Sequence, residues 1–320
     1  MKVHGLLLLY KPKGLTSNAA LQKARRLMDA DKAGHGGTLD PMADGLLPVM
    51  FGEACKLAES ALEGDKAYEA TLRLGQVTTT DDTEGEVVAD APVDFTDAQL
   101  DAVLARFRGR IVQVPPVFSA LKVGGKPLYR YAREGNPLQA DPREVTIHEL
   151  ELTGRRIGEE PSLSIRVTCT KGTYIRSLAR DIGAALGCGA HLAALRRTRV
   201  GRFDVQSAVG LEALAGMAQE GRGRHLVALE QLVADWPSVM LDDASAARFC
   251  QGQVVTTRIA GGDTGTDIIS TSTSNSIPGS GFEPSPKIAV HCGGRLIGLG
   301  RSTLTTDSTC ALTPVRIIVS

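Results

Sequence analysis

The chain has 320 residues, of which 42% are apolar, 22% charged and 4% aromatic. This composition is typical of globular proteins and excludes collagen-like, wholly disordered and disulfide-framework chains. At roughly 150 residues per domain, the length indicates about two domains. The 36 basic and 36 acidic residues cancel, which excludes a simple polybasic tail binder. A nucleic-acid enzyme is not excluded, because it needs one basic face and not a basic total.

The N-terminal half predicts a mixture of strands and helices. The apolar run Gly5–Tyr10 predicts a short buried strand, and Ser17 is a candidate N-cap for the helix that follows. Alternation over Lys66–Leu74 predicts a strand with Tyr68 on its apolar side. Thr96 is the candidate N-cap of a second helix that ends before residue 109.

Farther along the chain the mixture of strands and helices continues. Leu163–Cys169 alternates as a strand, and the apolar spacing over 175–186 predicts a helix. Strands and helices mix without a regular βαβ rhythm, which predicts an α+β fold with a mainly antiparallel sheet and flanking helices. Residues 261–286 are rich in Ser, Thr and Gly and predict a flexible insertion. We expect a catalytic domain over 1–238 and a small all-β domain over 239–320.

The cysteine pattern and the apolar runs indicate in which cellular compartment the protein is expected. Six cysteines are scattered without a C-x-x-C pair or a His/Cys cluster at zinc spacing, which predicts reduced thiols and no metal site. The run Gly5–Tyr10 is too short for a secretion signal. No apolar run approaches the roughly 18 residues that a membrane span needs. We therefore expect a cytoplasmic protein without a membrane partner.

Basic residues gather in three segments. Met1–Gly36, Arg106–Arg133 and Lys171–Arg202 each hold seven lysines or arginines, whereas Asp81–Asp101 holds eight acids and no base. If the three segments converge in the fold, they form a surface that can track phosphates. The alternative is that each segment is an ordinary solvated face.

The densest motif is GHGGTLDPMADGLLP, which covers Gly34–Pro48. Its four glycines and two prolines predict a shaped loop and not a regular element. Pro41 biases Asp40 toward an extended conformation, and a carboxylate held in this way suits a positioned nucleophile or base. The alternative is an Asx-turn in which Asp40 only accepts backbone hydrogen bonds. Asp44 suggests a carboxylate pair, but Asp44 with Gly45 is more simply a turn.

This motif resembles the catalytic loop of the TruB family of tRNA pseudouridine synthases. Four further segments agree with that family in order and spacing from residue 5 to about 201. They are GLLLLYKPKGLTSN at the N-terminus, KAYEATLRLGQ, QVPPVFSALKVGGKPLYRYAREG, and KGTYIRSLARDIG with GCGAHLAALRRTRVG. The C-terminal CGGRLIGLG is similar to the family's small RNA-binding PUA-like module. One departure is Thr79, where the family often has Asp, so we assign the loop 75–85 no role in RNA contact.

The resemblance implies conversion of uridine-55 to pseudouridine in the T-loop of tRNA, with a pseudouridine-synthase-like fold and no cofactor. It implies that Asp40 is the catalytic aspartate, that Tyr68 stacks on the target base, and that Arg176 pairs with Asp40. His35, Tyr174 and Leu195 match positions around the flipped nucleotide or the T-loop. It implies tRNA as the partner, no obligatory protein partner, and a monomer.

The reaction breaks a glycosidic bond, turns the base and forms a carbon–carbon bond, so it needs a nucleophile or base and a dry pocket. Asp40 can supply the first, either by attack or by removing a ribose proton, and the sequence does not choose between them. A nearby Arg176 would favour the ionised carboxylate. Tyr68 offers a flat face for a flipped base.

Each of these residues also has an alternative interpretation without a functional role. Tyr68 and Leu195 would be core residues, Arg176 a surface helix charge, and His35 a turn residue. The competing function is a protein that binds or folds the T-arm of tRNA without chemistry. Such a binder has no use for a positioned carboxylate beside phosphates.

Overall fold

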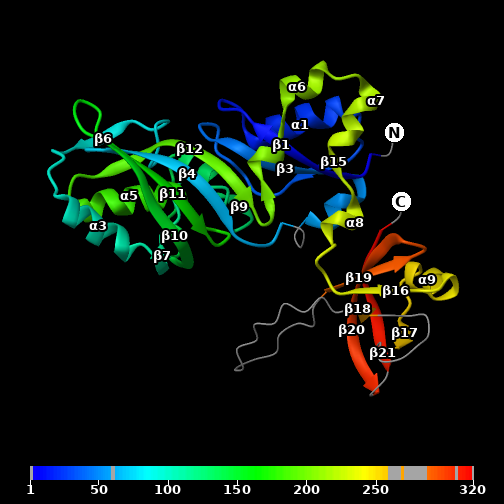
Figure 1. Ribbon diagram of the computed structural model, residues 1–320. Coiled ribbons are helices and arrows are strands. Elements are labelled where there is room, and N and C mark those ends of the chain that lie inside the picture. Colours follow the sequence, from blue (N-terminus) through cyan, green and yellow to red (C-terminus); the bar gives the residue numbers. More distant parts are fainter. Residues whose placement is uncertain (1–2, 59–61, 259–267, 270–286, 307–308, 319–320) are drawn as a thin grey trace.

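The computed structural model describes residues 3–58, 62–258, 268–269, 287–306 and 309–318. Two sheets organise these residues: a long curved sheet that runs across Figure 1, and a smaller sheet below its right end. The insertion expected at 261–286 falls outside the described residues, except for the short strand β18 (Ile268–Ile269).

The large sheet has the strand order β14-β1-β3-β12-β4-β11-β10-β7, with β2, β13 and β15 paired at its side. Its pairs are antiparallel except β1 with β14 and β12 with β3, which confirms the mainly antiparallel α+β fold. The strands are β1 (Gly5–Lys11), β2 (Ala33–His35), β3 (Asp44–Phe51), β4 (Lys66–Leu74), β7 (Gly109–Gln113), β10 (Arg143–Arg156), β11 (Ser162–Cys169), β12 (Ala190–Val200), β13 (Phe203–Asp204), β14 (Val209–Gly210) and β15 (Leu226–Val227).

Helices cover the large sheet in two groups. The helices α3 (Asp97–Arg106) and α5 (Ile175–Leu186) pack on the part formed by β4, β11 and β12, where Tyr68, Leu72 and Leu178 share one apolar core. The helix α1 (Ser17–Leu27) packs on β1 and β3 at the other end. The remaining elements of this region are α6 (Leu211–Gly216), α7 (Gln219–Arg222), α8 (Leu229–Leu232) and the short 3-10 turns Gly52–Lys56, Val205–Ser207 and Gly223–His225.

Local capping explains where two helices begin. Thr96 caps α3 as predicted, through a capping box in which the Thr96 hydroxyl and the Gln99 side chain each bond the other's backbone. The cap of α1 is Thr16 and not Ser17, since the Thr16 hydroxyl accepts from the Ala19 amide. Ser17 is instead the first helical residue.

The buried Ser17 hydroxyl has another task. It accepts from the Leu39 amide at 2.7 Å and donates to the Leu39 carbonyl at 2.9 Å. These two bonds hold the start of α1 against the loop that carries Asp40.

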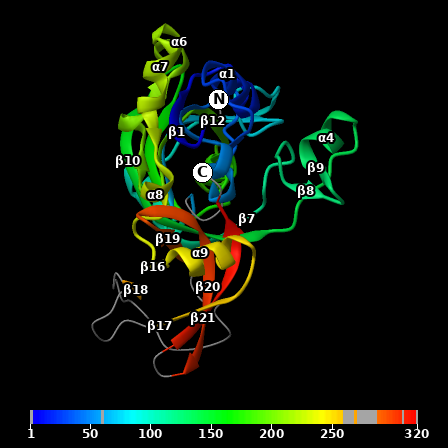
Figure 2. The same ribbon diagram turned by 90° about the vertical axis from the view of Figure 1, so that its right-hand side faces the viewer.

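Two small hairpins extend from the large sheet. One consists of β5 (Gln76–Thr78) and β6 (Val87–Asp90). The other consists of β8 (Lys122–Val123) and β9 (Lys126–Pro127), and it continues into α4 (Leu128–Arg133). In Figure 2 the second hairpin and α4 stand apart from the sheets as an arm, which we call the basic arm (residues 122–133).

The smaller sheet has the order β17-β21-β20-β19-β16-β18. Its strands are β16 (Ser238–Met240), β17 (Val255–Arg258), β18, β19 (Lys287–Cys292), β20 (Arg295–Thr306) and β21 (Thr309–Ile317), and one helix, α9 (Asp243–Cys250), packs on them. Leu296 and Leu299 of β20 join Leu229 and Leu232 of α8 in one apolar cluster. The two sheets are therefore joined by a shared core. Among the described helices, none is long and apolar enough to cross a membrane.

Candidate functional site

The Gly34–Pro48 motif forms the end of β2, a loop and the start of β3, so the prediction of a loop is confirmed around Asp40 and was wrong at both ends of the motif. At the base of the loop the Gly36 amide donates to the Pro48 carbonyl at 2.9 Å. Gly45 has φ +105°, and a Cβ there would lie 2.4 Å from the Arg197 carbonyl oxygen, so only glycine lets β3 approach β12 this closely. The prediction of a turn at Asp44 was wrong, because Asp44 is the buried first residue of β3 and its carboxylate pairs with Arg196 Nε at 2.9 Å.

The carboxylate of Asp40 forms an ion pair with Arg176, with 3.0 Å between Asp40 Oδ2 and Arg176 Nε. Only 6% of the Arg176 side chain is exposed, so the alternative of a surface helix charge was wrong. Its Nη1 lies 3.4 Å from Asp82 Oδ2 and donates to the Thr80 carbonyl, while Nη2 donates to the Phe118 carbonyl. One guanidinium thus joins the Asp40 loop to the loop after β5 and to the segment before the basic arm.

Burial and pairing act on Asp40 in opposite directions. Loss of solvent around the carboxylate raises the pKa of Asp40 above its ordinary value of 3.8, the Arg176 charge lowers it, and the Asp82 charge raises it again. The expected effect of Arg176 is present, but burial outweighs it. A carboxylate with a raised pKa is a stronger base than an exposed aspartate, which suits proton removal as well as nucleophilic attack.

Tyr68 lies on β4 with its side chain 7% exposed. It belongs to the apolar core of the sheet, as the alternative interpretation held, and it also lines a cavity beside Asp40. Burial raises the pKa of the Tyr68 phenol, so it is protonated at neutral pH. Arg197, its direct partner across the β12–β4 pair, acts in the opposite direction.

These side chains line a cavity of about 380 Å³. Five of the six residues that the sequence singled out line it together: Asp40, Tyr68, Tyr174, Arg176 and Leu195. The other lining residues come from the Asp40 loop, the segment 119–121, the turn before α5, and the strands β4 and β12: Gly37, Thr38, Leu39, Lys66, Ser119, Ala120, Leu121, Gly172, Thr173, Ile175 and Arg197.

His35 is the sixth predicted residue, and it is not part of the cavity lining. It lies on β2 opposite Val49, and burial together with the Arg197 charge lowers its pKa, so the imidazole is neutral at neutral pH. Its buried Nδ1 has no hydrogen-bond partner among the described residues.

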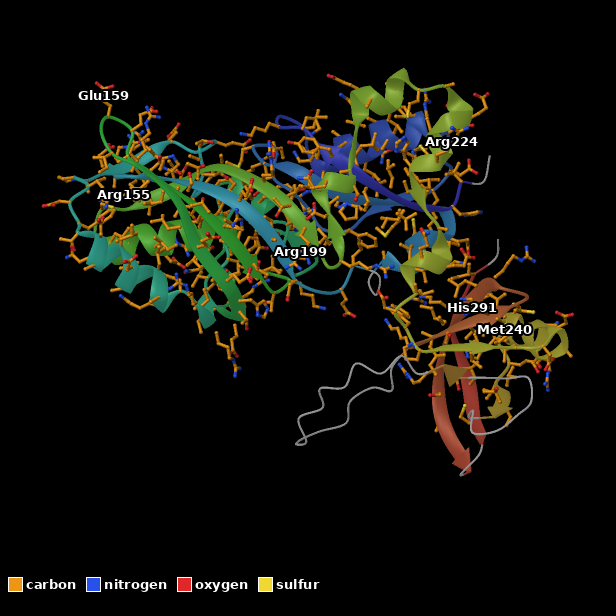
Figure 3. All side chains as sticks on the ribbon, viewed as in Figure 1. Arg155, Glu159, Arg199, Arg224, Met240 and His291 are labelled. Carbon is orange, nitrogen blue, oxygen red and sulfur yellow. The ribbon has the colours of Figure 1, made fainter. Side chains whose placement is uncertain are left out.

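Two larger hollows lie elsewhere. One of about 610 Å³ is lined by Cys55, Lys56 and the end of β21, and another of about 510 Å³ lies where β4 and β10 end. In Figure 3, Arg155 and Glu159 of the second hollow lie at the far end of the sheet from Arg199 on β12. Neither hollow includes any of the six residues that the sequence predicts for the site.

Three residues of the site were missed in the sequence. Asp82 lies in the loop that was assigned no role, and its side chain is 3% exposed against Arg176. Arg197 and Ser119 line the cavity and are 1% and 3% exposed. Ser119 Oγ has no hydrogen-bond partner among the described residues, which leaves a buried hydroxyl available to a ligand.

Two of the three basic segments contribute to the same region. Arg176 and Arg197, both from 171–202, reach the cavity, and the basic arm follows directly on the lining residues 119–121. Within the arm Lys126 lies 4.6 Å from the centre of the Tyr131 ring. No group of three or more His, Cys, Asp or Glu side chains that could hold a metal ion is found in the described part of the chain.

Comparisons with known proteins agree with this architecture. A family model described as the N-terminal domain of TruB family pseudouridylate synthase matches residues 25–175, and one described as the tRNA pseudouridylate synthase B C-terminal domain matches 176–237. The fold is similar to a chain in the archaeal box H/ACA sRNP Nop10-Cbf5 complex, with a TM-score of 0.66 and 24% identity over 99% of this chain and 87% of that chain. A chain of a Cbf5-Nop10-Gar1 complex gives a TM-score of 0.68 and 25% identity over 99% and 85%. The fold and site thus define a pseudouridine synthase.

Sequence relatives specify the family. The chain is 56% identical to the tRNA pseudouridine synthase B of Azoarcus sp. (strain BH72), over 78% of this chain and 83% of that protein. It is 55% identical to the protein of the same name from Aromatoleum aromaticum, over 79% and 81%. The chain belongs to the TruB family of pseudouridylate synthases.

Proposed function

We propose that this protein converts uridine to pseudouridine at position 55, in the T-loop of tRNA, with Asp40 as the catalytic residue. The observation that carries the proposal is the ion pair of Asp40 with the buried Arg176 inside a cavity lined by Tyr68. Relatives that share 53–56% of their residues with this chain and are named tRNA pseudouridine synthase B support tRNA as the substrate.

The geometry supports a division of labour around the base. Asp40 attacks the sugar or base, or removes a ribose proton. Arg176 holds the Asp40 carboxylate in place and is itself held by Asp82. The ring of Tyr68 offers a stacking face for a uracil that has left the RNA stack. Leu195 and Tyr174 close the sides of the cavity, and the free hydroxyl of Ser119 can bond a polar atom of the ligand.

The rest of the chain is proposed to hold the RNA. The basic arm and the basic residues around β12 would contact the phosphates of the T-stem, which supply sequence-independent affinity. We propose residues 1–238 as the catalytic domain and 239–320 as a PUA-like RNA-binding domain. The protein acts on tRNA in the cytoplasm.

A T-arm binder without chemistry is the second candidate, and the Asp40 site speaks against it. Burying the Arg176 guanidinium beside the carboxylate of Asp82 is costly, and breaking such a buried pair costs about 3–5 kcal/mol. Phosphate contacts alone would not need an acid that repels the RNA backbone.

The experiment is incubation of the purified chain with unmodified tRNA, followed by mapping of pseudouridine at each position. We expect modification at uridine-55 of the tRNA and of an isolated T-stem-loop hairpin, in buffer with a chelator and no cofactor. A tRNA carrying cytidine at position 55 is the matched control and should gain no pseudouridine. Pseudouridine at another site, or tRNA binding without any pseudouridine, would contradict the proposal.

A further inference from the structure

Arg197 is the largest side chain that is almost fully buried, and it lies in the wall of the cavity. Its Nε donates to the Leu46 carbonyl at 2.8 Å, and its Nη2 donates to the Gly37 carbonyl at 3.1 Å. Gly37 precedes Asp40 in the loop, and Leu46 follows it in β3. One guanidinium therefore fastens both ends of the catalytic loop to β12.

No carboxylate compensates this buried charge. Within the described part of the chain Arg197 forms no ion pair, whereas its neighbour Arg196 pairs with Asp44 and keeps 48% of its side chain exposed. A buried guanidinium without a carboxylate is expensive, so its remaining donors need acceptors. The two carbonyls take the Nε hydrogen and one Nη2 hydrogen, which leaves the second Nη2 hydrogen and both Nη1 hydrogens.

Tyr68 is a polar side chain that faces Arg197 across the sheet. In the antiparallel pair of β12 and β4, Arg197 stands directly opposite Tyr68. Directly opposite residues have Cβ atoms about 4.5–5.5 Å apart on the same face of a sheet, and both side chains line the cavity. The Tyr68 phenol and the guanidinium also interact electrostatically.

We propose that Arg197 is a positioning residue that donates a hydrogen bond to the Tyr68 hydroxyl oxygen and so turns the phenolic proton toward the base in the cavity. Arginine has donors and no acceptor, so in any hydrogen bond between the two the Tyr68 oxygen accepts. The phenolic proton is then free for the ligand. The inference rests on the proposed function, because it assigns the Tyr68 proton to the uracil that is being turned.

The first test detects the contact without any activity measurement. Full-length protein labelled with ¹³C at tyrosine Cζ has five tyrosine signals, and Tyr68→Phe assigns the one from Tyr68. Arg197→Met, which removes the donors at similar length, should shift this signal, and Arg197→Lys should restore part of the shift. Arg196→Met on the neighbouring position should leave the signal unchanged. An unmoved Tyr68 signal in folded Arg197→Met would overturn the contact.

The second test asks whether the contact serves turnover. Single-turnover formation of pseudouridine on the T-stem-loop hairpin is measured for Arg197→Met, Tyr68→Phe and the double variant. We expect Arg197→Met to lower the rate about tenfold or more in the parent, and less than about twofold when Tyr68 is already phenylalanine, because interacting residues are not additive. Arg197→Lys should recover part of the rate.

Equal losses in both backgrounds would show that Arg197 acts only through its bonds to Gly37 and Leu46, and the inference would fail. If Arg197→Met does not fold, the Arg197→Lys variant carries the same comparison, since it keeps the charge but not the fork of donors. Failure of the proposed function looks different, because the unsubstituted protein would then form no pseudouridine while the tyrosine signal still reports the contact.

Discussion

The two sheets of this molecule differ in the ionisable side chains that they bury. In and around the large sheet, six of the described Lys, Arg, His and Asp side chains are buried, and two of them, Arg176 and Arg197, line the cavity; the other four are Lys11, Asp44, Asp82 and His191. In the described part of residues 239–320, the buried polar side chains are only Ser245 and Thr257. Buried charges are costly and persist where pairing or function holds them. The contrast supports the proposed placement of the chemistry on the large sheet and of RNA binding on the small one.

Removal of the Arg176 guanidinium, which joins the carboxylates of Asp40 and Asp82, should have the largest effect on the chemistry assigned to the large sheet. Arg176→Ala leaves Asp40 and Asp82 unpaired, so we expect the single-turnover rate on the hairpin to fall about 10²-fold or more. The free energy of unfolding should fall by about 3–5 kcal/mol. Arg166→Ala, at an exposed pair with Glu151, is the control and should change neither quantity appreciably. Near-parent turnover in Arg176→Ala would remove this pair from the mechanism.

The pH dependence of the single-turnover rate also tests the pairing of Asp40 with Arg176. Burial raises the pKa of Asp40 above 3.8, so if the ionised form acts, the rate should fall with decreasing pH through a midpoint above that value. Arg176 lowers the pKa of Asp40, so this acid limb should move to higher pH in Arg176→Ala. The measurement is the single-turnover rate against pH for both proteins. An acid limb that does not move would separate Asp40 from Arg176 in the reaction.

A third change tests whether the small sheet serves RNA binding and not the chemistry. Exposed arginines lie on the small sheet at Arg295, Arg301 and Arg316. If this sheet only binds, alanine at all three should weaken full-length tRNA binding about tenfold, lower the salt dependence of binding, and leave turnover of the hairpin unchanged. These substitutions are preferable to deleting 239–320, because deletion would expose the shared core at Leu229 and Leu232. Equal losses on tRNA and hairpin would contradict the division of labour.

The smallest effect is expected for Asp44. Its partner Arg196 is half exposed, so Asp44→Asn should cost about 1 kcal/mol of unfolding free energy or less. Chemical denaturation measures this cost, and the single-turnover rate should stay within a few-fold of the parent. A folded Asp44→Asn protein that has lost activity would make Asp44 part of the chemistry and not of the frame.

The sequence predicted those parts of the molecule that local pattern determines. Alternation identified β4 and β11, helical spacing identified α5, and the glycine–proline motif identified the Asp40 loop. The sequence placed the N-cap of α1 one residue too late and predicted a turn at the start of β3, because tertiary contacts determine the local structure at both places. Ser17 is turned into the helix by its bonds to Leu39, and the Asp44–Gly45 pair is extended because Gly45 lets β12 approach.

The site was predicted as far as the family motifs reach. Asp40 and Arg176 were expected to pair and do so, yet Asp82 stood in an acidic segment without periodicity, and nothing local marks it as buried. Arg197 follows Arg196 in a basic run, and the strand period of two sends one inward and the other toward solvent. Only the fold shows which arginine lies in the cavity.

Asp40→Asn, measured for turnover and for binding in the same preparation, tests the catalytic role of Asp40 most directly. The substitution keeps the shape of the side chain and removes its charge. We predict that single-turnover pseudouridine formation falls to background, while tRNA binding at one fixed salt concentration stays within about tenfold, or about 1.4 kcal/mol. Asp44→Asn is the matched control in the same motif and should retain activity. Pseudouridine formation by Asp40→Asn at near-parent rate, or loss of binding together with activity, would contradict the account.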